Sequence, residues 1–357
     1  MPATKDLHDL GQSLWIDNIT RQMLDEGRIQ MYIDEYSVTG LTSNPSIFDK
    51  AIASGYYDDA IREKMALGFE GEDLFFELAI EDLRRAADLF LGVHERTGGL
   101  DGWVSLEVDP ELAYDTDATV AVVAELHERA GRPNVFIKIP GTTEGLPAIE
   151  ESIAAGMPVN VTLLFDADQY IAAADAYMKG IERRLAAELD AVVPSVASVF
   201  VSRWDKAVAD QVPDQLQNRL GLAVGQDAYR AYRELLNSER WQRLAGQGAR
   251  VQRLLFASTS TKDPTAPDTL FITGLAAPNT INTMPDETLE AFHDHGEVRG
   301  ALPADGGDAD AVFAEFEAAG VDVKALAAKL QSDGAAAFVG AWHELTVRIA
   351  AQQRAVA

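Results

Sequence analysis

The sequence predicts a parallel (β/α)8 barrel with additional helices, and three observations lead to this fold class. Eight short apolar runs end in polar residues, and each is followed by a helix-like stretch. Parallel neighbours need long return connections, which such helices provide. No run is followed by a G-x-G-x-x-G turn, which argues against the alternative of an open, doubly wound sheet.

The strand-like runs are spread over most of the chain. They cover residues 13–19, 36–44, 102–108, 134–140, 158–165, 195–202, 253–259 and 270–275. The connections after the second and sixth runs are long and predict helical insertions at about 45–101 and 204–252. With a C-terminal helical extension at about 285–357, we expect residues 1–357 to form a single barrel domain.

Helical periodicity is clearest in the connections between the runs. Apolar residues recur at helical spacing over 72–92 and 168–189, and Asp166 or Asp168 could cap the second of these helices. A third helix is predicted over 227–245. The tail from about 309 to 354 predicts two helices that are broken near Asp333 and Gly334.

Composition restricts the class of function. A net charge of −27 argues against nonspecific binding to nucleic acid or to an anionic membrane. The absence of cysteine excludes disulfides, thiolate metal sites and a cysteine nucleophile. No apolar run approaches the roughly 20 residues that span a bilayer, and the polar N-terminus lacks the apolar core of a signal peptide. We therefore expect a cytoplasmic protein without nucleic-acid or membrane partners.

A lysine stands inside the apolar run NVFIKIP, residues 134–140. Side chains alternate between the two faces of a strand, so Lys138 shares a face with Phe136 and Pro140, opposite three aliphatic side chains. The aliphatic face suits the helix layer. Lys138 is therefore expected inside the barrel near the carboxyl end of strand four, where barrel enzymes hold their reactive groups.

Polar side chains end most of the other runs in the same way. A single buried polar group is more often a satisfied core residue than a functional one, but convergence from seven strands is harder to explain by packing, because each burial costs free energy. Besides Lys138, the polar residues are Asp17, Thr42, Asn44, Ser105, Glu107, Asn160, Thr162, Ser198, Arg203, Ser258, Ser260 and Lys262.

Four of these residues could support Schiff-base chemistry. Burial disfavours the ammonium form of a lysine, and the neutral amine can attack a carbonyl to form an imine. A protonated imine is an electron sink, so a neighbouring carbon–carbon bond can break. Asp17 is a candidate acid/base for the adjacent hydroxyl, while Glu107 with Thr162 could hold the water that opens and closes the carbinolamine. Lys138 would be the amine.

Two cations, Arg203 and Lys262, lie just past the sixth and seventh runs. Cations at this position of a barrel often bind phosphate, and a salt bridge to one of the many acidic residues is the alternative for each. His293 and His295 could bind a metal, but two histidines in a polar loop are more often surface residues. We expect no metal site.

Five segments together resemble the transaldolase family. They are IDNI (16–19), GLTSNPSIF (40–48), FIKIPGTTEGL (136–146), VNVTLLFDADQY (159–170) and SVFVSRWD (198–205). The resemblance runs from about residue 11 to about residue 296, and the stretch 275–296 is similar to the longer bacterial branch. It implies a Schiff-base barrel enzyme of the non-oxidative pentose phosphate pathway that needs no cofactor or metal. Such an enzyme transfers a dihydroxyacetone unit from sedoheptulose 7-phosphate to glyceraldehyde 3-phosphate, giving erythrose 4-phosphate and fructose 6-phosphate.

The resemblance also implies roles for the candidate residues. Lys138 would form the imine, Asp17 would serve as acid/base for carbon–carbon cleavage, and Glu107 and Thr162 would handle the catalytic water. The positions that match substrate-binding residues are Asn44, Asn160, Ser198 and Arg203, with the arginine on the phosphate. An arginine that the better-known branch carries soon after the serine of strand seven is absent here. Lys262 is a candidate replacement, as a point charge in place of a fork, with Ser258 as its companion.

Two alternatives stand beside this interpretation. An aldolase would use the same lysine and release free dihydroxyacetone, and a catalytically inactive barrel would bind sugar phosphate as a sensor. The intact set of Lys138, Asp17, Glu107 and Thr162 argues against the sensor. In each case we expect phosphorylated sugars as ligands, and a monomer or a homodimer.

Overall fold

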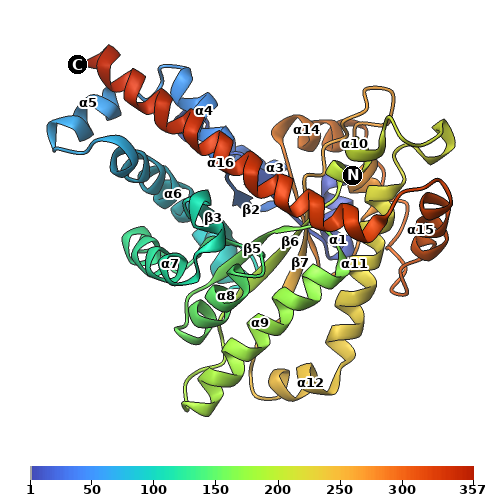
Figure 1. Cartoon of the computed structure of the whole chain (residues 1–357). Helices are drawn as coiled ribbons and strands as arrows, with labels where there is room; N and C mark the ends of the chain where they lie inside the picture. Colours follow the sequence, from blue (N-terminus) through green and yellow to red (C-terminus); the bar gives the residue numbers. More distant parts are fainter. Residues whose placement is uncertain (1) are drawn as a thin grey trace.

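A computed structural model describes residues 2–357 and shows eight parallel strands closed into a barrel in the chain order β1 to β8, surrounded by helices (Figure 1). The (β/α)8 barrel class is confirmed, since β8 pairs with both β7 and β1. The strands are β1 Ser13–Asp17, β2 Val38–Thr42, β3 Trp103–Glu107, β4 Val135–Pro140, β5 Val159–Leu164, β6 Ser195–Phe200, β7 Gln252–Ala257 and β8 Ile281–Met284.

The prediction of the eighth strand was wrong. Residues 270–275 contribute the short helix α13, Leu270–Gly274, and β8 follows at Ile281–Met284. A short apolar run fits a buried helical turn as well as a strand, and periodicity alone does not separate the two. Phe271 and Ile272 of α13 are buried, which satisfies the apolar pattern without a place in the sheet.

Helices cover the outside of the barrel and fill the long connections (Figure 1). Within residues 2–357, none of them combines the length and apolar character that a membrane span requires. The α-helices are α1 Ala3–Leu10, α2 Arg21–Asp25, α3 Arg28–Glu35, α4 Pro45–Ala53, α5 Asp58–Ala66, α6 Gly71–Arg96, α7 Thr116–Ala130, α8 Gly145–Ala154, α9 Ala167–Ala186, α10 Ser202–Val208, α11 Leu220–Asn237, α12 Glu239–Ala245, α13, α14 Asp286–His295, α15 Ala309–Ala318 and α16 Val323–Val356, and the 3-10 helices are η1 Pro110–Tyr114 and η2 Asp214–Leu216.

Two of the predicted helices, α6 and α9, form close to the expected positions, and Asp166 caps α9 by accepting a hydrogen bond from the Gln169 amide at 2.7 Å. The prediction of one helix over 227–245 was wrong. The chain forms α11 from Leu220 and then α12, separated by Ser238. Ser238 leaves the helical conformation and caps α12 through the Trp241 amide, as serine does readily at helix starts.

The predicted break near Asp333 and Gly334 was also wrong. Helix α16 runs through Gly334 without interruption, and the tail divides earlier, between α15 and Val323. Glycine lowers helix propensity by about 1 kcal/mol, but packing overrides it here. A Cβ on Gly334 would lie 3.1 Å from side-chain atoms of both Arg203 and Leu163, so the glycine lets α16 approach the barrel closely.

Aromatic rings fill the barrel interior below its carboxyl end. Trp103 stacks on Phe136 with centroids 4.1 Å apart, and Trp15 lies 6.3 Å from the same ring. Gly40 on β2 makes room for this layer, because a Cβ there would lie 2.5 Å from the Trp15 indole. The layer lies among the strands beneath Lys138, which follows Phe136 by two residues on β4.

Candidate active site

A cleft of about 770 Å³ opens at the carboxyl end of the barrel. Most of the predicted site residues converge on it although they come from different strands. Those that line it are Asp17, Asn44, Lys138, Thr162, Ser198, Arg203, Ser258 and Lys262. Glu107 and Asn160 lie directly behind the lining, the first beside Lys138 and the second bonded to Ser198.

Lys138 lies on β4 beside Glu107 on β3 and Asn160 on β5. Its side chain is buried, with 5% of the residue exposed. Nζ donates a hydrogen bond to the carbonyl oxygen of Ser43 at 2.9 Å and lies 3.6 Å from Oε2 of Glu107. An ammonium group has three donors, so these contacts orient the nitrogen without using its full capacity. The nitrogen therefore stands at the floor of the cleft, open to a ligand.

Glu107 is the second buried charge at this end of the barrel. Neither of its carboxylate oxygens has a hydrogen-bond partner among the described residues. Loss of hydration raises the pKa of Glu107 to about 6; the positive charge of Lys138 opposes this shift and the negative charge of Asp17 adds to it. The hydroxyl of Thr162 on β5 is also buried, and it too has no partner within residues 2–357. Such atoms are rare in folded proteins and indicate a place for water or a ligand.

Asp17 is the last residue of β1, and a chain of hydroxyl groups orients its carboxylate. Thr42 on β2 donates to Oδ1 at 2.7 Å, and its oxygen lies 2.7 Å from the hydroxyl of Thr283 on β8. Loss of hydration raises the pKa of Asp17, while Lys138 and the Thr42 hydrogen bond oppose the shift. The sequence did not indicate Thr283, since β8 has only four residues and shows too short a pattern to be recognised.

The two predicted asparagines are held in different ways. Asn160 is fully buried; it donates to the Ser105 hydroxyl at 3.2 Å and accepts from the Ser198 hydroxyl at 2.8 Å. Asn44 is half-buried at the start of α4, where its Oδ1 caps the helix by accepting from the Ile47 amide at 3.2 Å. Capping fixes the Asn44 side chain and leaves its NH2 group as the part that can reach a ligand.

The predicted cations Arg203 and Lys262 both line the cleft and lie close enough for the charge of Arg203 to act on Lys262. The guanidinium of Arg203 lies 5.0 Å from the ring centroid of Phe200 and 5.7 Å from that of Phe338 on α16. Within residues 2–357 it makes no salt bridge, which removes the alternative of a structural ion pair with a neighbouring acid. Burial lowers the pKa of Arg203, and desolvation together with the charges of Arg203 and Lys206 lowers that of Lys262. Lys262 also makes no salt bridge within residues 2–357, and the acidic charges that act on the two cations are those of Glu107 on Arg203 and Asp17 on Lys262.

Ser258 lies immediately after β7 and lines the cleft together with these cations. Its backbone has φ of +55°, and its hydroxyl lies 2.9 Å from that of Ser202 at the start of α10. Lys262 donates to the Ser260 hydroxyl. The loop after β7 is therefore folded back so that Ser258, Ser260 and Lys262 all line the cleft.

The two histidines of the His293–His295 pair lie on α14 and face different partners. His293 contacts the Thr4 hydroxyl at 3.0 Å and stacks on Tyr36, while the exposed His295 contacts Asp268 at 3.0 Å. No group of three or more histidine, cysteine, aspartate or glutamate residues in the described part of the chain is placed to hold a metal ion. His295 is exposed, as the surface interpretation expects, whereas His293 is partly buried, and both residues lie on a helix and not in the predicted polar loop.

Comparison with known proteins agrees with this geometry. The family model described as Transaldolase/Fructose-6-phosphate aldolase matches residues 14–349. The chain is 43% identical to a protein named transaldolase from Frankia alni (strain DSM 45986 / CECT 9034 / ACN14a), over 97% of this chain and 96% of that protein. It is 44% identical to one of the same name from Thermobifida fusca (strain YX), over 98% and 97% of the two chains. The chain therefore belongs to the transaldolase/fructose-6-phosphate aldolase family.

Proposed function

We propose that this protein is a transaldolase, which moves a dihydroxyacetone unit from sedoheptulose 7-phosphate to glyceraldehyde 3-phosphate through an imine on Lys138. The observation that carries the proposal is the setting of Lys138: a buried amine on the cleft floor, held by one carbonyl at 2.9 Å, with the Glu107 carboxylate 3.6 Å away. Membership of the family and the names of its relatives support the same activity.

The reaction begins at the ketone carbon of the donor sugar. Lys138 passes a proton to the Glu107 carboxylate beside it, and the neutral amine attacks C2 to give the carbinolamine. Glu107 returns the proton to the carbinolamine hydroxyl, which leaves as water and gives a protonated imine. Glu107, whose pKa of about 6 lets it exchange protons near neutral pH, and the Thr162 hydroxyl hold the departing water. The unpartnered oxygens of these two residues support this role.

Asp17 then acts on the hydroxyl of C4. Its carboxylate takes the hydroxyl proton, the C3–C4 bond breaks, and its electrons pass into the imine to leave an enamine on Lys138. Erythrose 4-phosphate departs as the aldehyde. The enamine carbon next attacks the aldehyde carbon of glyceraldehyde 3-phosphate, and Asp17 returns the proton to the new oxygen. Water releases fructose 6-phosphate from Lys138, and Thr42 keeps the Asp17 carboxylate oriented throughout.

The substrate is held at both ends of its carbon chain. Arg203 and Lys262 bind the phosphate with Ser258 beside them, since their charge has no acidic partner within residues 2–357. The amides of Asn44 and Asn160 and the Ser198 hydroxyl bind the sugar hydroxyls near Lys138. Lys262 thus takes the place of the second phosphate-binding arginine.

The same proposal covers the general properties of the protein. Residues 1–357 form one barrel domain with helical insertions at about 45–101 and 204–252 and a helical extension at about 285–357. The protein acts in the cytoplasm as a monomer or homodimer. It uses no cofactor or metal and binds no nucleic acid.

Borohydride trapping tests the proposal directly. The protein is mixed with fructose 6-phosphate, reduced, digested and analysed by mass spectrometry. A three-carbon dihydroxyacetone adduct on Lys138 is expected, because cleavage removes glyceraldehyde 3-phosphate before reduction. A folded protein that binds the sugar but yields no adduct would instead be a sensor of sugar phosphate.

The family also includes aldolases, and one further assay separates the two activities. Fructose 6-phosphate is supplied with and without erythrose 4-phosphate as acceptor. A transaldolase forms sedoheptulose 7-phosphate only with the acceptor and releases little free dihydroxyacetone without it. Release of dihydroxyacetone at the same rate in both conditions would identify an aldolase.

A further inference from the structure

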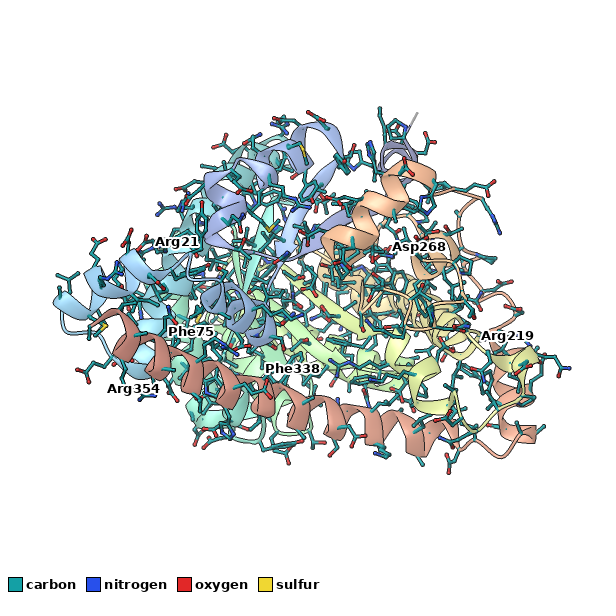
Figure 2. All side chains as sticks on the ribbon, turned by 90° about the horizontal axis from the view of Figure 1, so that it is seen from above. Arg21, Phe75, Arg219, Asp268, Phe338 and Arg354 are labelled. Carbon is teal, nitrogen blue, oxygen red and sulfur yellow. The ribbon has the colours of Figure 1, made fainter. Side chains whose placement is uncertain are left out.

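Helix α16 crosses the barrel from the region of α15 to the far side near α5 (Figure 1). In the view from above, Phe338 lies midway along this helix between Arg219 near its start and Arg354 near its end (Figure 2). The helix passes over the carboxyl ends of the strands, where Gln331 reaches the barrel. Its Nε2 donates to the carbonyl oxygens of Gly141 and Leu163, both at 3.0 Å.

These carbonyls belong to the two strand ends that carry the imine and water chemistry. Gly141 follows β4, three residues after Lys138, and Leu163 follows Thr162 on β5. The Gly141 amide also donates to the Thr162 carbonyl at 2.7 Å. Gln331 therefore links the ends of β4 and β5 through its two hydrogen bonds, and the backbone of Thr162 is part of the same hydrogen-bonded group.

The backbone at Leu163 is strained, and the hydrogen bonds of Gln331 help to hold it. On β5 and β6, Val161 pairs with Ala197 and the next pair is Leu164 with Val199. Two residues of β5 therefore lie opposite one residue of β6, which is a β-bulge with one extra residue. Leu163 has φ of +60°, a conformation that costs a leucine free energy of about 1–3 kcal/mol and persists only when its surroundings impose it. The Gln331 hydrogen bond and the close approach of Gly334 to the Leu163 side chain are part of those surroundings.

We propose that Gln331 is a positioning residue of the active site: it holds the bulged end of β5 so that the Thr162 hydroxyl stays aimed at the water. This inference rests on the proposed function, because it assigns Gln331 an effect through the role of Thr162. It also assigns a function to the C-terminal extension, since α16 brings a side chain from more than 160 residues away to the strand end.

The test is a double-mutant cycle. Gln331→Leu removes both hydrogen bonds at similar volume, and Ser332→Ala, on an exposed neighbour, is the matched control. We expect Gln331→Leu to lower kcat about 10-fold, within the loss of up to about 100-fold that a displacement of 1 Å can cause. The KM for fructose 6-phosphate should change little. In a Thr162→Ala background the same substitution should have almost no further effect on kcat, since the two residues act as one unit.

Full additivity of the two losses, or an unchanged kcat in Gln331→Leu, would overturn the inference. Borohydride trapping of the wild type separates this failure from that of the proposed function, because wild-type protein without an adduct has no imine chemistry to position. If Gln331→Leu does not fold, Gln331→Glu takes its place. Its carboxylate can donate to neither carbonyl, whereas the protonated acid has one O–H group that can donate to one of them, so its activity relative to wild type should rise as pH falls. A ratio that does not depend on pH would count against the inference.

Discussion

The two ends of the barrel bury a charge pair to a similar extent, but they satisfy it differently. At the amino end, Arg253 and Asp101 are 5% and 4% exposed, with Nη1 and Oδ1 3.5 Å apart. Asp101 accepts hydrogen bonds from the Trp15 indole at 2.9 Å and from the Ser13 hydroxyl. Arg253 in turn donates to Ser13 and to the carbonyl oxygens of Leu100 and Thr280.

At the carboxyl end, Lys138 and Glu107 are 5% and 7% exposed, and Nζ lies 3.6 Å from Oε2, much as in the first pair. In contrast to Asp101, however, neither carboxylate oxygen of Glu107 has a hydrogen bond within the described residues. A buried ion pair stabilises a fold only when further hydrogen bonds satisfy its remaining atoms. Most polar atoms of Arg253 and Asp101 have such hydrogen bonds, whereas the carboxylate oxygens of Glu107 have none within the described residues. The first is therefore expected to serve stability and the second chemistry.

Replacement of Lys138 should have the largest effect. Lys138→Ala removes the nucleophile, so we expect kcat to fall by at least about 1,000-fold while the protein stays folded. Turnover and thermal unfolding are measured on the same preparation, with Lys138→Met as a control that keeps the volume. Near-wild-type turnover in either variant would move the nucleophile elsewhere in the chain.

Removal of Asp101 should show the opposite profile. Asp101→Ala leaves the Arg253 charge buried without its partner, which typically costs about 3–5 kcal/mol of unfolding free energy. The kcat of the folded fraction should stay near the wild-type value. Denaturant unfolding gives the free energy, and Asp101→Asn, which keeps an acceptor for Trp15, should lose less. A stable Asp101→Ala variant with impaired kcat would remove the distinction between the two ends.

Arg203 sharpens the comparison within the carboxyl end. Hydrogen bonds to a charged group contribute about 1.5–3 kcal/mol, so Arg203→Ala should raise the KM for fructose 6-phosphate about 10- to 100-fold. Unphosphorylated donors should be affected little. Arg219→Ala, at an arginine paired with Glu315 outside the cleft, is the control. Equal loss with both kinds of donor would contradict a phosphate role.

The pH dependence of kcat and of stability should reflect the raised pKa of Glu107, whose carboxylate is buried without hydrogen bonds within the described residues. If its carboxylate activates water, kcat falls about tenfold per pH unit below its pKa of about 6. The folded pKa lies above the value of 4.5 expected without burial, so the folded state loses stability as pH rises from about 4.5 to 6. Glu107→Gln should therefore be inactive. Its free energy of unfolding, taken relative to that of the wild type at the same pH, should be higher at pH 7 than at pH 4 by up to about 2 kcal/mol. If the variant is instead destabilised more at pH 7 than at pH 4, relative to the wild type, the pKa of Glu107 is not raised by folding.

The smallest effect is expected at Phe338. Its ring lies 5.7 Å from the Arg203 guanidinium, and both side chains are only partly buried, so we take the contribution of about 0.5–1 kcal/mol that holds for cation–π contacts open to water. Phe338→Leu should raise the KM for phosphorylated donors about 2- to 5-fold and leave kcat unchanged. Val347→Ala, at an exposed position of the same helix, is the control. A loss in kcat instead of KM would place Phe338 at the reacting carbons.

Much of the site could be predicted from local pattern. Alternation along β4 indicated that Lys138 points inward, and the same rule indicated Glu107, Asn160 and Thr162, because a strand has a period of two wherever it lies. The pattern failed where it was short or ambiguous. The eighth strand was misplaced, and Thr283, which contacts Thr42, was missed with it.

The sequence alone determined the barrel class, most of its strands and the polar residues at their carboxyl ends, because these follow from the periodicity of single elements. Only the tertiary structure decided which of those residues lack hydrogen-bond partners within residues 2–357 and how α16 docks on them. Gln331 and Phe338 reach the strand ends and Arg203 across long stretches of chain. The docking depends on a glycine that local propensity treats as a helix break, since close packing outweighs the small intrinsic cost of that residue.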